Sequence, residues 1–199
     1  FWFFEPSHNF LSLHIQLSHR QHDPMNEATS GTLYVVGTPI GNLDDLSPRA
    51  RSVLGAVDLI AAEDTRRTRR LLSSIGVNCK LIGYHDHNER EQTPGLVNRL
   101  QRGESLALVS DAGMPSISDP GIRLVRAALA ADLAVVTVPG ASAAAAALTI
   151  SGLATDRYVF EGFLPRRGAA RKQRLEALRS ESRTMIFYEA VHRVGEAID

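Results

Sequence analysis

Five short apolar runs, each followed by a longer helical stretch, constrain the fold of this chain more than any other feature. The runs are rich in β-branched residues and almost continuously apolar, which is typical of strands covered on both faces. Strands that alternate with helices in this way predict an α/β fold with a mostly parallel, doubly wound sheet and right-handed crossovers. The runs occupy residues 33–36, 58–62, 80–84, 105–110 and 133–138.

The stretches between the runs carry local signals for helix ends. Ser47 before Pro48 predicts an N-cap with proline at the first helical position, and Gly76 predicts a helix C-terminus. Asn88 with Glu91 three residues later resembles a capping box. Helices are therefore expected from about residue 49, at 65–75, 88–102, 121–131 and 142–150.

The pattern divides the chain into three parts. Residues 1–30 do not share the periodicity of the rest and are expected to be a leader outside the domains. Residues 1–24 are expected to be sequence upstream of a natural start at Met25, with an N-terminal arm as the alternative. Residues 31–153 are expected to form a first α/β domain, in which the alanine run near its end packs tightly in a helix. Residues 154–199 are expected to begin a second, truncated α/β domain, whose alternating pattern predicts antiparallel strands.

Composition excludes several classes of protein. With 199 residues, 44% of them hydrophobic, the chain is too apolar to be disordered, and a net charge of zero leaves any RNA contact to local basic patches. The single cysteine, Cys79, excludes a disulfide framework and a cysteine-based zinc site. A single cysteine is typical of proteins in a reducing compartment, so we expect a cytoplasmic protein. The sequence contains no run of about 18 apolar residues, so no membrane span is predicted.

Three loops that follow predicted strands are rich in glycine, proline and serine. In open parallel sheets, ligands bind at the edge where the carboxyl ends of the strands lie, which is where such loops begin. The loop at 37–45 has glycines for close backbone approach but neither the dinucleotide nor the Walker spacing, and it could be only a tight turn. The loop at 110–121 is longer than an ordinary connection of ~4–6 residues. Its Asp111 could accept hydrogen bonds from ligand hydroxyls, unless the loop only caps itself. The small residues of the loop at 138–148 would allow a ligand to approach closely, or would serve only to pack the helix that follows.

Two further loops carry titratable side chains. Glu63 and Asp64 end the second run, and the arginines that follow them would form either a basic patch or a solvated helix face. His85 and His87 have the spacing of a metal pair, but the chain offers no second set of ligands. We therefore expect no metal and favour a polar loop that faces the substrate.

Taken in order, these motifs resemble the small-subunit ribosomal RNA methyltransferases of the tetrapyrrole methylase superfamily. The resemblance covers Gly31 to Asp199 and rests on the loop 37–43, residues 62–66, the HDHNE loop, the loop 110–121 and Pro139–Ser142. It implies cytidine 2′-O-methylation of 16S ribosomal RNA, with S-adenosylmethionine as methyl donor and without a metal. It also implies a two-domain fold that is often dimeric, with the donor between the domains, so a homodimer is expected.

The resemblance also implies which residues bind the donor. They are Pro39, Asp111, Ala112, Gly113, Met114, Ser142 and Ala143. One departure is in the late motif, where Ala190 and Val191 stand in place of the family's serine and proline.

A ribose hydroxyl is a weak nucleophile, so a nearby base is expected to assist the reaction. The candidates are Glu63, Asp64, His85 and Glu189, of which Glu63 and Asp64 are favoured by their place at a strand end. Ribosomal RNA, free or in the assembled small subunit, would be held through its phosphates by two basic clusters. These are Arg66, Arg67, Arg69 and Arg70, and Arg166, Arg167, Arg171, Lys172 and Arg174.

Alternative functions remain at this point. One is methylation of a corrin-type tetrapyrrole carbon on the same scaffold, against which the arginines and the two polar loops favour RNA. Another is an inactive fragment that only binds an adenosyl ligand or RNA. A nicotinamide dehydrogenase is disfavoured because no dinucleotide fingerprint follows the first run.

Overall fold

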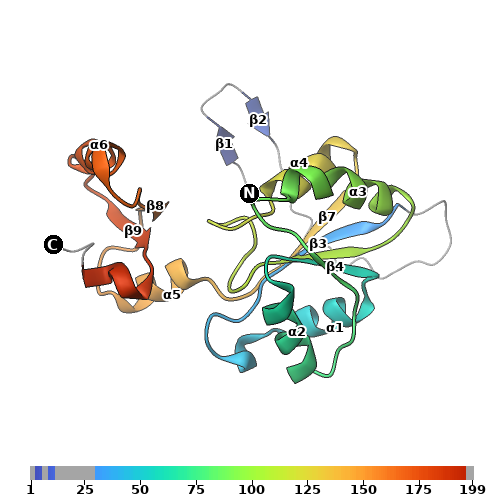
Figure 1. The fold of residues 1–199 in the computed structure, drawn as a ribbon. Helices are drawn as coiled ribbons and strands as arrows, with labels where there is room; N and C mark the ends of the chain where they lie inside the picture. Colours follow the sequence, from blue (N-terminus) through green and yellow to red (C-terminus); the bar gives the residue numbers. More distant parts are fainter. Residues whose placement is uncertain (1–2, 6–8, 12–29, 196–199) are drawn as a thin grey trace.

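The computed structural model describes residues 3–5, 9–11 and 30–195, and it places a five-stranded parallel sheet beside a smaller two-stranded one (Figure 1). Two short strands near the N-terminus, β1 (Phe3–Glu5) and β2 (Asn9–Leu11), pair antiparallel. The expected leader at residues 1–30 lies mostly outside the described residues.

The five predicted strands all form and all run parallel, which confirms the α/β expectation. They pair in the order β5-β4-β6-β3-β7, so β6 is central. This order brings the carboxyl ends of β3, β4 and β6 next to one another at one edge of the sheet. The strands are β3 (Thr32–Val36), β4 (Leu59–Ala62), β5 (Leu81–Gly83), β6 (Leu106–Val109) and β7 (Ala134–Val138).

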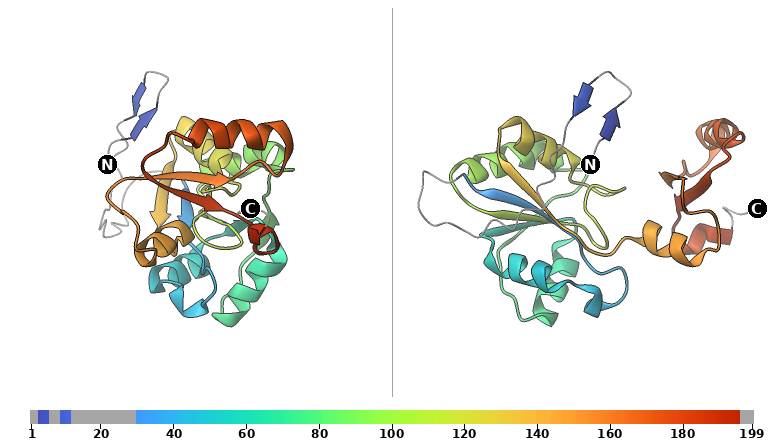
Figure 2. Two further views of the ribbon diagram at one scale, coloured as in Figure 1. Left: turned by 90° about the vertical axis from the view of Figure 1, so that its left-hand side faces the viewer. Right: turned by 180° about the vertical axis from the view of Figure 1, so that it is seen from behind.

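Two helices cover each face of this sheet (Figure 2). Helices α1 (Pro48–Ala56) and α2 (Thr65–Ser74) pack on one face, where Leu54 and Leu72 meet Ala107 and Val109 of β6. Helices α3 (Glu89–Gln101) and α4 (Ile122–Ala130) pack on the other, where Leu96 and Leu124 meet Leu108. Because apolar residues point to both faces of β6, the run had to be continuously apolar. Among the described residues, no helix is long and apolar enough to cross a membrane.

The helix ends follow the sequence signals with one exception. The Ser47 hydroxyl accepts the N–H of Ala50 at 3.0 Å, and Gly76 ends α2 at a φ of +69°. The exception is Asn88, for which the prediction of a capping box was wrong. Its amide oxygen accepts the N–H of His85 at 2.8 Å and its amide nitrogen donates to the carbonyl of Gly83 at 3.0 Å, so it fastens the histidine loop to β5 instead.

The second unit comprises β8 (Tyr158–Phe163), α6 (Gly168–Leu178), β9 (Thr184–Tyr188) and the 3-10 turn η2 (Val191–Arg193). Its strands pair in parallel, so the expected antiparallel character was wrong. The physical reason is α6, a helical crossover that returns the chain to the starting edge before β9 begins.

Helix α5 (Ala143–Ile150) follows β7, and a 3-10 turn, η1 (Leu43–Asp45), precedes α1. Helix α5 lies beside the second unit and contacts β9 (Figure 1). The expected tight packing of its alanine run was wrong, because Leu148 is its one buried residue and most of the alanines are exposed. The high helix propensity of alanine is sufficient to account for the helix itself.

A buried hydroxyl pair links the histidine loop to α3. The Tyr84 ring is 1% exposed, and its hydroxyl lies 2.9 Å from that of Thr93, which itself donates to the carbonyl of Glu89. Tyr84 is therefore the donor of the pair. We expect Tyr84→Phe to lower the free energy of unfolding by about 1 kcal/mol in a urea titration. Tyr158→Phe, at a strand position that is 46% exposed, is the control and should change nothing. Equal losses in both variants would contradict this assignment.

Candidate functional site

The three glycine-rich loops converge at the carboxyl edge of the large sheet, as the sequence predicted. The N–H of Thr38 donates to the carbonyl of Gly113 at 2.9 Å, and the N–H of Gly113 donates back at 3.0 Å. The N–H of Gly37 donates to the carbonyl of Val138 at 3.0 Å, and the Thr38 hydroxyl donates to the carbonyl of Ser110 at 3.2 Å. Hydrogen bonds to backbone carbonyls thus hold together the loops that leave β3, β6 and β7.

Glycine is required where two of these loops touch. A Cβ on Gly37 would lie 2.6 Å from the Cα of Gly140 and 2.6 Å from the Sδ of Met114. A Cβ on Gly140 would lie 2.8 Å from the Cα of Gly37 in return. Gly113 has a φ of +83°, which other residues rarely adopt. The loops are consequently held at a distance that only bare backbone permits.

Carboxylates join the loops that leave β4 and β6. The N–H of Asp111 donates to the carboxylate of Glu63 at 3.0 Å, and the N–H of Asp64 donates to the carboxylate of Asp111 at 3.1 Å. The guanidinium of Arg67 pairs with the other oxygen of Asp111 at 3.1 Å. Each loop therefore satisfies a backbone donor of its neighbour, and α2 contributes the countercharge.

The two favoured base candidates differ in acidity. Partial burial raises the pKa of Glu63 above its ordinary value, the Asp111 N–H opposes this, and the charges of Asp111, Asp119 and Asp86 add to it. Hydrogen bonds from the side chain and the N–H of Arg66 lower the pKa of Asp64 to about 2. Asp64 is also the N-cap of α2. Of the two, Glu63 is the stronger base.

The other two candidates differ in setting. His85 lies in the loop after β5, where its Nδ1 is buried and has no hydrogen-bond partner among the described residues. Glu189 lies on the second unit, just after β9. It accepts the N–H of Ala190 and pairs with Arg193, and these contacts lower its pKa, which makes it a weak base.

The sequence reasoning missed two side chains of the 110–121 loop. Burial raises the pKa of Asp119, which a hydrogen bond with Ser110 opposes and the charges of Asp111 and Asp86 reinforce. The hydroxyl of Ser116 is buried without a partner among the described residues, and its backbone has a φ of +69°. The one sequence signal for both was the unusual length of this polar loop.

The predicted donor-binding residues lie in the converging loops. Gly113 is buried, Ala112 and Ala143 are exposed, and the remaining four are half-buried. Ser142 is the N-cap of α5, where its hydroxyl accepts the N–H of Ala145 at 3.5 Å. The half-buried residues are Pro39, Asp111, Met114 and Ser142.

The arginines of α2 divide into two kinds. Arg66 pairs with Asp64 at 2.9 Å and Arg67 with Asp111, so both belong to the carboxylate network. Arg69 and Arg70 are exposed and have no ion pair with another described residue. Arg166, Arg167 and Arg171 lie at the start of α6 in the second unit.

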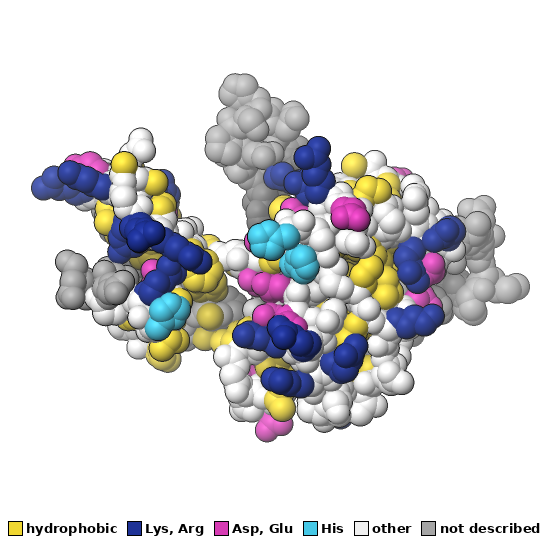
Figure 3. All heavy atoms as spheres, viewed as in Figure 1, with side chains coloured by type: hydrophobic (Ala, Val, Ile, Leu, Met, Phe, Trp, Pro, Cys, Tyr) yellow, Lys and Arg dark blue, Asp and Glu magenta, His cyan; other side chains and the backbone are white. Residues whose placement is uncertain are grey.

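Figure 3 shows one face on which histidine and acidic side chains of the first unit lie between Lys and Arg side chains above and below them. The two histidine rings of the loop after β5, His85 and His87, lie 6.0 Å apart. Within the part of the chain that the structure describes, no group of three or more His, Cys, Asp and Glu residues could hold a metal ion.

The family model of the tetrapyrrole (corrin/porphyrin) methylases matches residues 32–199. Two curated relatives are each called ribosomal RNA small subunit methyltransferase I. The one from Pseudomonas aeruginosa is 55% identical over 170 residues, covering 85% of this chain and 60% of the relative. The one from Xylella fastidiosa is 56% identical over 171 residues, covering 86% and 63%. The chain thus spans about three fifths of the length of these relatives.

Solved structures with the same fold have distant sequences. The methyltransferase CobJ has a TM-score of 0.59 at 19% identity, covering 83% of this chain and 71% of that one. Uroporphyrin III C-methyltransferase from Thermus thermophilus has a TM-score of 0.57 at 19% identity, covering 82% and 72%. At this identity the likeness shows a shared fold.

Proposed function

This chain belongs to the tetrapyrrole methylase family, and on that premise we propose that it transfers a methyl group from S-adenosylmethionine to the 2′-oxygen of a cytidine in small-subunit ribosomal RNA. The observation that carries the proposal is the convergence of the loops after β3, β6 and β7, next to the partly buried carboxylate of Glu63. The identity of 55–56% to ribosomal RNA methyltransferases supports RNA as the substrate.

The residues present fit an adenosyl donor. The close approach of Gly37 and Gly140 brings two of the loops together, and the small, exposed side chains of Ala112 and Ala143 in the converging loops leave room for an adenosyl group. The carboxylate of Asp111 is partly exposed, at 24% of its side chain. Each of its oxygens has one partner, so it can still accept a hydrogen bond from a ribose hydroxyl of the donor. The bound donor supplies a methyl group on a positively charged sulfur, which already activates the carbon towards attack.

In this mechanism Glu63 takes the proton of the attacking ribose hydroxyl. Its raised pKa makes it a better base than Asp64, and general-base assistance contributes typically 10²–10⁴-fold. Arg67 holds Asp111, and the N–H of Asp111 holds the Glu63 carboxylate in place. Positioning of the two reactants contributes up to roughly 7–11 kcal/mol to such transfers. We assign this positioning to the rigid backbone contacts among the loops.

RNA phosphates are the proposed partners of arginines on α2 and at the start of α6, and the small-subunit RNA, free or assembled, is the proposed substrate. Arg69 and Arg70 on α2, with Arg166, Arg167 and Arg171 at α6, would lie on either side of the bound ribose. A homodimer and a cytoplasmic location complete the proposal.

A labelled-methyl assay tests this function against tetrapyrrole methylation. The chain is incubated with methyl-labelled S-adenosylmethionine and, in separate reactions, small ribosomal subunits, protein-free 16S RNA and uroporphyrinogen III. We expect label in RNA, recovered as an alkali-resistant dinucleotide, because a 2′-O-methyl group removes the hydroxyl that alkali needs for cleavage. Label in the tetrapyrrole would overturn the RNA assignment. Donor binding by calorimetry without label in any acceptor would leave a binding fragment and reject the enzymatic proposal.

A further inference from the structure

An arginine occupies the second position of every helix that flanks the large sheet. The residues are Arg49 in α1, Arg66 in α2, Arg90 in α3 and Arg123 in α4. Each helix begins where the chain leaves the carboxyl end of a strand, so all four arginines lie along the edge of the sheet that carries the converging loops.

Helix stability does not explain this placement. The N-terminus of a helix carries a partial positive charge, so a cation in the first turn is unfavourable there, while the last turn favours one. Helices α1, α2 and α4 nevertheless have no basic residue in the last turn. Helix α3 follows the usual pattern, with Glu89 and Glu91 in its first turn and Arg99 in its last, so Arg90 is the one first-turn charge there that opposes the dipole. The helix dipole therefore does not account for an arginine in the first turn of each helix, and any such arginine without an ion pair needs another explanation.

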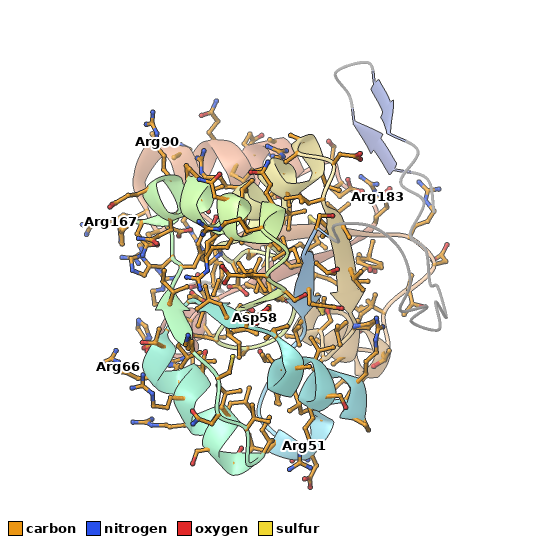
Figure 4. All side chains as sticks on the ribbon, turned by 90° about the vertical axis from the view of Figure 1, so that its right-hand side faces the viewer. Arg51, Asp58, Arg66, Arg90, Arg167 and Arg183 are labelled. Carbon is orange, nitrogen blue, oxygen red and sulfur yellow. The ribbon has the colours of Figure 1, made fainter. Side chains whose placement is uncertain are left out.

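Their surroundings separate the four arginines into two groups. Arg66 pairs with Asp64, and Arg123 pairs with Glu89 at 3.1 Å, an ion pair that also bridges α3 and α4. Arg49 and Arg90 are exposed and make no ion pair with another described residue. Figure 4 places Arg66, Arg90 and Arg167 on one side of the molecule, with Arg183 on the other.

We propose that Arg90, on the α3–α4 side of the sheet, binds a backbone phosphate of the RNA substrate, opposite the arginines of α2. The proposal rests on the RNA specificity proposed above and adds a third contact region to the arginines of α2 and α6. RNA would then be held from both faces of the sheet and from α6, with its reactive ribose over the carboxylates between them. A guanidinium suits this role because it stays charged and binds phosphate oxygens in pairs.

Charge reversal at this position separates a ligand role from a structural one. In Arg90→Glu, an acid replaces a base at a helix N-terminus, so thermal stability should stay equal or rise. Affinity for 16S RNA should fall at least about fivefold at 0.1 M salt, and the slope of log affinity against log salt should fall by about 0.7–0.9, as for one lost phosphate contact.

Arg102→Glu is the matched control, because Arg102 caps the other end of the same helix and is 70% exposed. There the acid should lower thermal stability and leave RNA affinity unchanged. Equal RNA affinity and slope in wild type and Arg90→Glu would overturn the proposal. So would a loss of binding to assembled subunits alone, which would assign Arg90 to a protein contact. Failure of the wild-type chain to bind either RNA form while it binds S-adenosylmethionine would instead reject the RNA function itself.

Discussion

Glu63→Gln is expected to reduce the rate of methyl transfer by about 10²–10⁴-fold while leaving donor binding intact. The amide oxygen of glutamine can still accept the N–H of Asp111, which lies 3.0 Å from the carboxylate in the native chain. The substitution therefore removes the base and keeps the contact that orders the loop. Single-turnover kinetics and calorimetry with S-adenosylmethionine measure the two effects separately.

The pH dependence gives a second readout of the same substitution. Burial raises the pKa of Glu63, so the carboxylate must lose its proton before it can act, and the rate should rise with pH through that raised pKa. The free energy of unfolding should change with pH in the opposite direction. A carboxyl whose pKa is raised on folding stabilises the protein when protonated, and this contribution is lost as pH rises through the folded value. Glu63→Gln should therefore be at least as stable as wild type at neutral pH.

Asp64→Asn provides the matched control. Asparagine caps helices as well as aspartate does, and a group with a pKa of about 2 has little basicity to lose. Its rate should stay within a few-fold of wild type. A rate for Glu63→Gln that also stays within a few-fold would assign the base to another group.

Gly37→Ala is expected to disrupt the site by separating its loops. The added methyl group would meet the backbone of Gly140 at 2.6 Å, and a backbone cannot rotate away as a side chain can. Overpacking of this kind typically costs about 1–3 kcal/mol in the free energy of unfolding. A displacement of about 1 Å at a reacting centre can reduce the rate by about 10²-fold. Urea denaturation and the methyl-transfer assay measure these losses.

Gly95→Ala is the same substitution where nothing lies within 4 Å of the new methyl group. It lies inside α3, where alanine is favoured over glycine by up to about 1 kcal/mol, so this variant should be slightly more stable and fully active. If Gly37→Ala behaved like Gly95→Ala, the loops would have more freedom than their backbone contacts indicate.

Much of the fold could be predicted because its signals are local. The five strands, the caps at Ser47 and Gly76 and the meeting of three loops follow from apolar runs, from capping chemistry and from the common edge of a parallel sheet. The parallel pairing of β8 and β9 could not be predicted from the alternation of β8. Alternation reports which face is covered and not which way the partner runs.

The site was harder to predict because its chemistry depends on long-range contacts. The ion pair of Arg67 with Asp111 joins α2 to the loop after β6, which are far apart in the sequence, so the sequence could not separate Arg67 from the other arginines of α2. Glu63 and Asp64 are neighbours with the same charge, and only burial and the contact with Arg66 separate their basicities. Asp119 had no motif of its own and became visible through its burial.

The reciprocal hydrogen bonds between residues 63–64 and Asp111 make the two loops energetically interdependent. Truncating Glu63 or Asp111 to alanine leaves a backbone donor in the opposite loop without its acceptor, and that second loop is then free to relax. Changes at the two positions should therefore be non-additive, with the double variant losing less than the sum of the single losses. Over evolutionary time, drift in one loop would be tolerated only where the other loop changed with it.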